Sequence, residues 1–272
     1  MSDETHSPML SVRDVSKHFG GIKAVDGISL DVAPNRVTGL IGPNGAGKTT
    51  LFNVISGFYK PDAGEITFKG ERIDGLPLHA TFQKGLCRTF QISRELKLMT
   101  VLENLMLVPP HQPGERLLNT WFRQHVVRSR EAEIREKALD SLERVGLLHL
   151  EDEYAGNLSG GQKRLLELAR AMMADPDLIL FDEPGAGVNP AERGELANEI
   201  LRLVSERGKT VFLIGHEMDL VMKVCDPIIV MNRGRKLTEG TPDEVSSDPR
   251  VLEVYLGSEQ PVSGELWWEP GT

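Results

Sequence analysis

The chain has 272 residues, of which 40% are hydrophobic, so it can bury the core of one large domain or of two joined lobes. Its formal net charge of −9 argues against a surface that wraps nucleic acid. Its two cysteines, Cys87 and Cys225, lie far apart without the spacing of metal ligands, and its apolar runs are too short to span a membrane.

The N-terminal region predicts two short strands and a candidate aromatic contact for a ligand. Residues 1–8 are polar and lack the basic and apolar regions of a signal peptide. Residues 9–15 and 28–32 have the composition of strands. Phe19, which precedes two glycines, has two interpretations. It is either a core aromatic, which is the commoner case, or an exposed ring on which adenine stacks.

Residues 42–50, with the sequence GPNGAGKTT, carry the strongest chemical signal. The segment consists of Gly42, Pro43, Asn44, Gly45, Ala46, Gly47, Lys48, Thr49 and Thr50. It lies between apolar residues suited to a buried strand and apolar residues suited to a helix. In this pattern backbone N–H groups cradle phosphate oxygens, Lys48 adds a cation and the Thr49 hydroxyl ligates Mg²⁺. A glycine-rich turn would explain the glycines but not the Lys-Thr pair.

The middle of the chain predicts a strand, a loop and a helix. Residues 65–69 alternate like a strand, and for the later Gln91 a surface amide is the simplest interpretation. Residues 109–115 are rich in Pro and Gly, which indicates a loop or a boundary. Residues 131–145 have the apolar spacing of an amphipathic helix.

A second helix start is predicted at the sequence LSGGQ, residues 158–162. Ser159 is placed as the N-cap, and Gly160, Gly161 and Gln162 open the helix. The backbone N–H groups of such a helix start suit an anion. Taken alone, the pattern is more typical of an ordinary capped helix.

Two acidic residues end a predicted buried strand. Residues 178–181 read LILF, and Asp182 and Glu183 follow directly. Open α/β sheets place their ligands at the carboxyl ends of the strands. Asp182 is therefore a candidate for the Mg²⁺ shell, and Glu183 is a candidate to orient or deprotonate water.

The last third predicts a capped helix and further strands. Asn189 and Pro190 start the helix. The buried strand at 210–214 is followed by His216, a candidate contact for a terminal phosphate because its strand end is expected in line with the acids. Residues 258–272 lack periodicity, so a flexible tail is the default interpretation, and a docking peptide is the second one.

The order of these motifs resembles the nucleotide-binding subunit of an ABC transporter, with LSGGQ as the specific element. The resemblance covers residues 9–257. It implies an α/β fold with a phosphate-loop (RecA-like) core, an antiparallel β subdomain and an inserted α-helical lobe. The core is expected at 9–86 and 165–257 and the lobe at 87–164. The resemblance also implies a head-to-tail dimer, in which the LSGGQ helix of one subunit covers ATP held by the other.

The resemblance assigns roles around ATP. Phe19 resembles the adenine-stacking position, and Val25 resembles the apolar contact beside it. Residues 42–50 are the phosphate cradle. Around the ATP of the opposing subunit, the implied contacts are Ser159, Gly160, Gly161 and Gln162.

The resemblance also assigns metal and catalytic roles. The implied Mg²⁺ site comprises Thr49, Gln91 and Asp182, where Gln91 joins Mg²⁺ and the attacking water to the helical lobe. Glu183 is the implied general base, and His216 is the implied switch at the γ-phosphate.

Longer matches narrow the resemblance. The stretches KHFGG, RTFQISRELKLMTVLENL, AGNLSGGQKRLLELARAM and DEPGAGVNPAE are similar to the G-type ATPase of branched-chain amino-acid importers, and the extra segment at 109–130 fits that subgroup. Three positions depart from the wider family. Asn189 stands where Asp is frequent, Gly215 where an acidic residue is common, and Phe19 where Tyr is commoner.

The expected protein is a cytoplasmic ATPase, peripheral on the inner face of the cell membrane, which drives the import of branched-chain or other hydrophobic amino acids. Its expected partners are two membrane permease subunits, a second ABC ATPase subunit and, indirectly, a solute-binding protein, with no nucleic acid. Urea or amide importers share these motifs. The sequence is also compatible with a lipopolysaccharide-type exporter or with a non-transport ATPase, such as an assembly factor.

Overall fold

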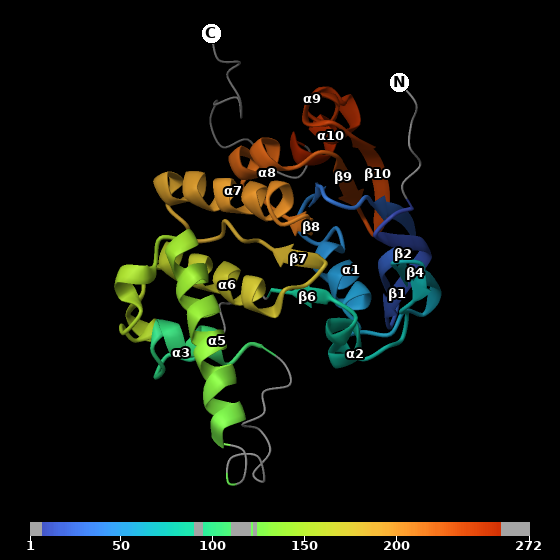
Figure 1. The fold of residues 1–272 in the computed structure, drawn as a ribbon. Helices are drawn as coiled ribbons and strands as arrows, with labels where there is room; N and C mark the ends of the chain where they lie inside the picture. Colours follow the sequence, from blue (N-terminus) through green and yellow to red (C-terminus); the bar gives the residue numbers. More distant parts are fainter. Residues whose placement is uncertain (1–6, 90–94, 110–120, 122–123, 257–272) are drawn as a thin grey trace, which may run out of the picture.

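The computed structural model describes residues 7–89, 95–109, 121 and 124–256. The chain forms two β-sheets, one antiparallel and one mostly parallel, and helices cover both faces of the parallel sheet (Figure 1). The α/β class that the sequence predicts is confirmed.

The antiparallel sheet has the strand order β2-β1-β4-β5. Its strands are β1 (Leu10–Phe19), β2 (Ile22–Val32), β4 (Ala63–Phe68) and β5 (Glu71–Arg72). Leu10 and Val12 alternate with more exposed residues along β1 and are fully buried, as expected for a sheet with one solvated face. Both strands expected from the sequence, at 9–15 and 28–32, are present but longer than expected, because pairing of β1 with β2 continues to Phe19 and Ile22 across a tight turn.

The parallel sheet has the order β10-β9-β3-β8-β7-β6. Its strands are β3 (Val37–Ile41), β6 (Leu86–Arg88), β7 (Leu178–Asp182), β8 (Thr210–Ile214), β9 (Ile228–Asn232) and β10 (Arg235–Gly240). Only the edge strand β10 is antiparallel to its neighbour among these pairs. β3, β7 and β8 are buried throughout, which explains their continuous apolar sequences. The residues that follow these three strands gather at one edge of the sheet.

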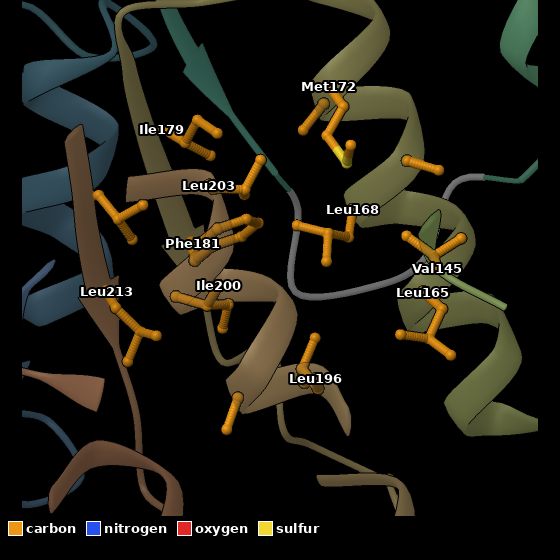
Figure 2. Packing of buried hydrophobic residues seen from close by; sticks show 14 of the residues in the cluster. Val145, Leu165, Leu168, Met172, Ile179, Phe181, Leu196, Ile200, Leu203 and Leu213 are labelled. Atoms are coloured by element: carbon orange, nitrogen blue, oxygen red, sulfur yellow. The ribbon is translucent and has the colours of Figure 1, made fainter. Parts of the chain in front are cut away.

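The faces of the parallel sheet carry two separate cores. On one face, α1 (Lys48–Ile55) packs together with the antiparallel sheet, and Phe52 meets Phe212 with ring centroids 4.9 Å apart. The opposite face carries α6 (Gly160–Ala174), α7 (Pro190–Ser205) and α8 (Met218–Val224). Figure 2 shows Leu168, Phe181 and Ile200 in this second core. The short helices are α2 (Leu78–Gln83), α9 (Pro242–Ser247) and α10 (Pro249–Leu256).

A helical region separates β6 from β7 in the sequence (Figure 1). Its elements are α3 (Val101–Met106), α5 (Gln124–Arg144), the 3-10 turns η2 (Leu148–Leu150) and η3 (Ala155–Asn157), and the start of α6. α5 packs against α3 and α6, and Ile134, Ala138 and Leu142 are its buried apolar contacts. The helix expected at 131–145 is present but begins earlier. The expected limits of the lobe fall inside β6 and α6, and the division itself stays a prediction.

Some expectations concern segments outside the described residues. These are Gln91, most of the Pro- and Gly-rich segment at 109–115, and the tail at 258–272. Among the helices of the described ranges, none combines the length and the apolar character that crossing a membrane requires.

Candidate active site

The loop after β3 follows a path that two glycines make possible. Gly42 and Gly47 have φ angles of 151° and 100°. A Cβ atom on Gly42 would lie 2.0 Å from the carbonyl oxygen of Met231, and one on Gly47 would lie 2.0 Å from that of Ala24. The loop is therefore pressed between β9 and β2, and this contact fixes its backbone in front of α1.

Lys48 begins α1 and folds back across this loop. Its Nζ donates to the carbonyl oxygens of Gly42 at 2.7 Å and Pro43 at 3.1 Å, and the residue is 6% exposed. Burial lowers the pKa of Lys48, and the charges of Glu183 and Asp182 oppose that shift. The predicted cation therefore interacts electrostatically with both predicted acids.

The remaining residues of the predicted phosphate cradle differ in exposure. Asn44 and Gly45 form the exposed tip of the loop, and Ala46 is buried beneath it. Thr49 and Thr50 lie partly exposed in the first turn of α1. The loop therefore presents backbone at its tip and hydroxyl groups at the helix start.

Asp182 ends β7 with its side chain fully buried. Arg88, the last residue of β6, donates from Nη2 to Asp182 Oδ2 at 2.8 Å, and the Arg88 side chain is also buried. The other carboxylate oxygen, Oδ1, is buried without a hydrogen-bond partner among the described residues. Arg88 Nη1 also donates to Oδ1 of Asn53 in α1 at 2.5 Å. Among the described residues, the Asp182 carboxylate is thus hydrogen-bonded at Oδ2 and has no hydrogen-bond partner at Oδ1.

Glu183 and His216 meet beside Asp182. His216 Nε2 lies 3.0 Å from Glu183 Oε1, and the two side chains are 35% and 16% exposed. Glu183 has a φ of 55°, in the left-handed region, and its N–H donates to the carbonyl oxygen of Ile214 at 2.9 Å. The ends of β7 and β8 therefore place the predicted base and the predicted phosphate contact within hydrogen-bonding distance.

Gly215 is one of the positions that depart from the family pattern. A Cβ atom there would lie 2.5 Å from Cγ2 of Val221, a fully buried residue of α8. Its φ is not in the left-handed region. Close packing of the chain against α8, rather than backbone freedom beside His216, explains this glycine.

The LSGGQ segment caps α6 as predicted. Ser159 Oγ accepts from the N–H of Gln162 at 3.1 Å, and Gln162 Oε1 accepts from the N–H of Ser159 at 2.9 Å. Ser159 and Gly160 are exposed. A Cβ atom on Gly161 would lie 1.9 Å from Oε2 of Glu192, so this carboxylate from the first turn of α7 reaches the start of α6.

The predicted adenine contacts differ in accessibility. Phe19 is 42% exposed and lies edge-on to Tyr59, with ring centroids 5.2 Å apart, so it is not a core aromatic. Its stacking on adenine stays a prediction. Val25 is 0% exposed and belongs to the core beneath the antiparallel sheet. The structure does not bring Val25 to the surface beside Phe19, and its contact with a ligand stays a prediction.

Sequence reasoning missed two charged residues of this region, Arg88 and Glu192. Arg88 ends a short apolar strand, and a cation in that position could have been recognised as unusual. Its partner, Asp182, could not be identified without knowing that β6 pairs with β7. Glu192 resembled an ordinary first-turn acid of α7. Cys87 and Cys225 are both unpaired, and burial raises the pKa of each to about 12.

Comparison with known proteins identifies the family. The family described as "ABC transporter" matches residues 25–186, which include the loop after β3, the LSGGQ segment and both acids. This chain belongs to the ABC transporter family. A second family, described as "Branched-chain amino acid ATP-binding cassette transporter", matches residues 235–260 of this ABC protein. The matched residues thus include the catalytic region and much of the C-terminal region.

Individual relatives narrow the position within the ABC family. The ABC chain is 44% identical over 250 residues to the high-affinity branched-chain amino acid transport ATP-binding protein BraF of Pseudomonas aeruginosa, which covers 92% of this chain and 98% of BraF. It is 41% identical over 250 residues to LivG of Escherichia coli, with the same coverage. A crystal structure of a nucleotide-free ATP-binding cassette from an ABC transporter covers 91% of this chain and 98% of its own, with a TM-score of 0.79 and 41% identity.

Proposed function

We propose that this ABC protein hydrolyses ATP to drive the import of branched-chain or other hydrophobic amino acids through separate membrane subunits. The observation that carries the proposal is the 44% identity to a branched-chain amino acid transport ATP-binding protein along nearly its whole length. Support for the chemistry comes from the electrostatic interaction of Lys48 with Asp182 and Glu183, and from the contact of Glu183 with His216.

ATP binding begins at the loop after β3. Backbone N–H groups at the exposed tip and at the start of α1 receive phosphate oxygens. Lys48 is held by two carbonyl oxygens of the loop, and phosphate replaces these neutral acceptors with a charged one. Phe19, which is exposed and supported by Tyr59, stacks on adenine.

The residues present fit a Mg²⁺ ion. Asp182 offers the buried oxygen Oδ1, which has no hydrogen-bond partner in the described ranges, and Thr49 offers a hydroxyl at the start of α1. Oxygen ligands of this kind suit Mg²⁺. Gln91 is proposed as a further ligand and lies outside the described residues. When bound, Mg²⁺ neutralises charge on the phosphate oxygens.

Hydrolysis uses the pair formed by Glu183 and His216. Glu183 orients the attacking water and accepts its proton while the water oxygen bonds to the γ-phosphorus and the bond to the bridging oxygen of ADP breaks. His216 orients that carboxylate, since its Nε2 lies 3.0 Å from Glu183 Oε1. His216 and the phosphate loop both follow strands at the carboxyl edge of the parallel sheet. Lys48 balances the negative charge that gathers during the transfer.

The active form is a head-to-tail dimer with the same or a paralogous chain. The start of α6, with Ser159 exposed and Gly161 at the first turn, receives the γ-phosphate of ATP bound to the opposing subunit. Two phosphate-facing helix starts then surround one triphosphate. ATP binding closes the dimer, and hydrolysis lets it reopen.

Permease subunits contact exposed apolar side chains of the helical region. Leu98 is 90% exposed, and Leu96, Leu107 and Tyr154 are also largely exposed. A β-bridge between Thr100 and Tyr154 brings two of these segments together. Such a patch suits a protein interface. This contact holds the ATPase at the inner face of the membrane, and the solute-binding protein acts from the other side.

Transport in proteoliposomes tests the proposed cargo. The chain is reconstituted with its two cognate permease subunits and the solute-binding protein, and the accumulation of labelled leucine is compared with that of labelled urea. We expect leucine uptake that requires ATP and is lost in Glu183→Gln. Uptake of urea alone would replace the amino-acid assignment by the urea or amide importer. ATPase activity without uptake of either solute would contradict the importer assignment.

A further inference from the structure

The buried contact between Arg88 and Asp182 is not explained by the roles assigned so far. Arg88 ends β6, a strand of only three residues at the edge of the parallel sheet. Its guanidinium joins two other elements, since Nη2 donates to Asp182 at the end of β7 and Nη1 donates to Asn53 in α1. β6, β7 and α1 lie together in the fold (Figure 1). One side chain thus ties the acid-bearing strand to the helix that begins at the phosphate loop.

Energetics explain why Asp182 needs this partner. The Asp182 side chain is 0% exposed, and a buried carboxylate is strongly destabilised unless it is paired and hydrogen-bonded. Arg88 compensates Oδ2 only, and Oδ1 stays without a hydrogen-bond partner among the described residues. A planar guanidinium with several fixed donors can satisfy two partners at once, whereas an ammonium is a point charge. The arrangement therefore selects which carboxylate oxygen remains available.

We propose that Arg88 is a positioning residue for the Mg²⁺ site: it holds Asp182 by Oδ2 so that Oδ1 faces the metal shell. Arg88 itself touches neither nucleotide nor metal. The inference rests on the proposed Mg²⁺ role of Asp182. In the sequence, Arg88 precedes Gln91, another of the proposed metal ligands, by three positions. Removing a partner that orients a metal ligand typically weakens metal affinity by about 10–100-fold.

The experiment measures binding rather than turnover. The affinity of the full-length chain for a fluorescent ATP analogue is determined in EDTA and at a series of Mg²⁺ concentrations. In Arg88→Met we expect the half-saturating Mg²⁺ concentration to rise about tenfold or more, while the affinity in EDTA stays within about twofold of wild type. A role confined to packing would instead lower the melting temperature without moving the Mg²⁺ dependence, and that result would overturn the proposal.

Two further variants test whether the effect of Arg88→Met comes from its contact with Asp182. Asn53→Ala removes the contact of Arg88 with α1 and leaves the Asp182 contact, so its Mg²⁺ dependence should stay near wild type. A shift equal to that of Arg88→Met would contradict the proposal. Arg88→Lys keeps a cation in the buried site and replaces Arg88→Met if that variant does not fold. It should show a smaller shift in the same direction, and an unshifted Mg²⁺ dependence would count against the proposal.

Asp182→Asn distinguishes two hypotheses: that Asp182 is a Mg²⁺ ligand, and that Arg88 positions it. If it does not alter the Mg²⁺ dependence, the proposed metal site itself is wrong. If Asp182→Asn alters it and Arg88→Met does not, only the role of Arg88 is refuted. If both act through one carboxylate, the double variant should show no larger shift than Asp182→Asn alone.

Discussion

The two helix starts that are proposed to face phosphate are built in different ways. At α1, the loop is pressed against Met231 and Ala24, and Lys48 is buried across it. At α6, Ser159 and Gly160 are exposed, and the capping box is formed within the LSGGQ segment itself. The first site is fixed by contacts with β2 and β9. At the second, Ser159 and Gly160 are presented to solvent, and the Glu192 carboxylate covers Gly161.

This difference indicates separate tasks. A loop held between β2 and β9 is suited to bind a phosphate without further rearrangement. An exposed helix start is suited to a ligand that another molecule carries. Damage at α1 should therefore abolish ATP binding by a single subunit. Damage at α6 should leave that binding intact and reduce turnover by the assembled dimer.

The largest expected loss of ATP binding comes from Gly47→Ala. The new Cβ would overlap the carbonyl oxygen of Ala24 at a backbone angle unfavourable for alanine, so the loop must move. We expect a loss of at least ~3 kcal/mol in ATP binding, or about 100-fold in affinity, by fluorescence titration. Gly45→Ala is the matched control, because Gly45 also has a positive φ but no atom within 4 Å of the added Cβ. Equal effects of the two variants would refute the steric argument.

The next effect concerns turnover and not binding. Glu183→Gln removes the carboxylate that accepts the proton of water, so kcat should fall by about 10²–10⁴-fold while ATP still binds. The bound state should accumulate as a closed dimer. Size-exclusion chromatography with Mg²⁺ and ATP measures this dimer. A normal hydrolysis rate would exclude Glu183 as the base.

Mixing two inactive variants tests whether the two helix starts work across the dimer. Ser159→Arg blocks the start of α6, and Lys48→Ala removes the cation of the phosphate loop. Each variant alone should be inactive, and mixed dimers should recover part of the ATPase activity because one composite site is intact. Crosslinking first establishes that mixed dimers form. The test requires that mixed dimers form and that one intact site is enough for activity. If both conditions are met and activity still does not return, the hypothesis of a site shared across the dimer is wrong.

The smallest effect separates capping from catalysis at α6. Ser159→Ala should lower the unfolding free energy by about 1 kcal/mol, because the helix loses its N-cap. Thr241→Ala is the control, since Thr241 caps α9 with the same capping box. Both variants should lose similar stability by chemical denaturation, but only Ser159→Ala should slow ATP turnover. Slower turnover in both would assign the effect to stability alone.

Local chemistry explains most of what the sequence predicts correctly. The glycines and Lys48 of the phosphate loop, the N-cap at Ser159 and the cap of α7 at Asn189 depend on residues a few positions apart. The buried strands ending at Asp182 and Ile214 follow from continuous apolar runs. Each of these features is determined within a single element and its flanking turn.

Contacts between distant segments were not predictable. The Arg88–Asp182 pair requires knowledge that β6 and β7 are neighbours, although the helical region separates them in the sequence. The carboxylate of Glu192 at Gly161 requires the relative placement of α6 and α7. Val25 was expected beside a ligand, and its complete burial follows from the packing of β2 on the core.

The strand order also determines when each part of the chain can fold during synthesis. β1, β2 and β4 are neighbours and are complete by residue 68, so the antiparallel sheet has most of its partners as soon as it leaves the ribosome. β3 ends at residue 41, but its partners β8 and β9 begin at residues 210 and 228. The phosphate loop therefore emerges early and gains its final shape late, because the contact of Gly42 with Met231 awaits β9. A truncated translation product that ends before β9 will carry the complete phosphate-loop sequence and lack the strand that shapes it.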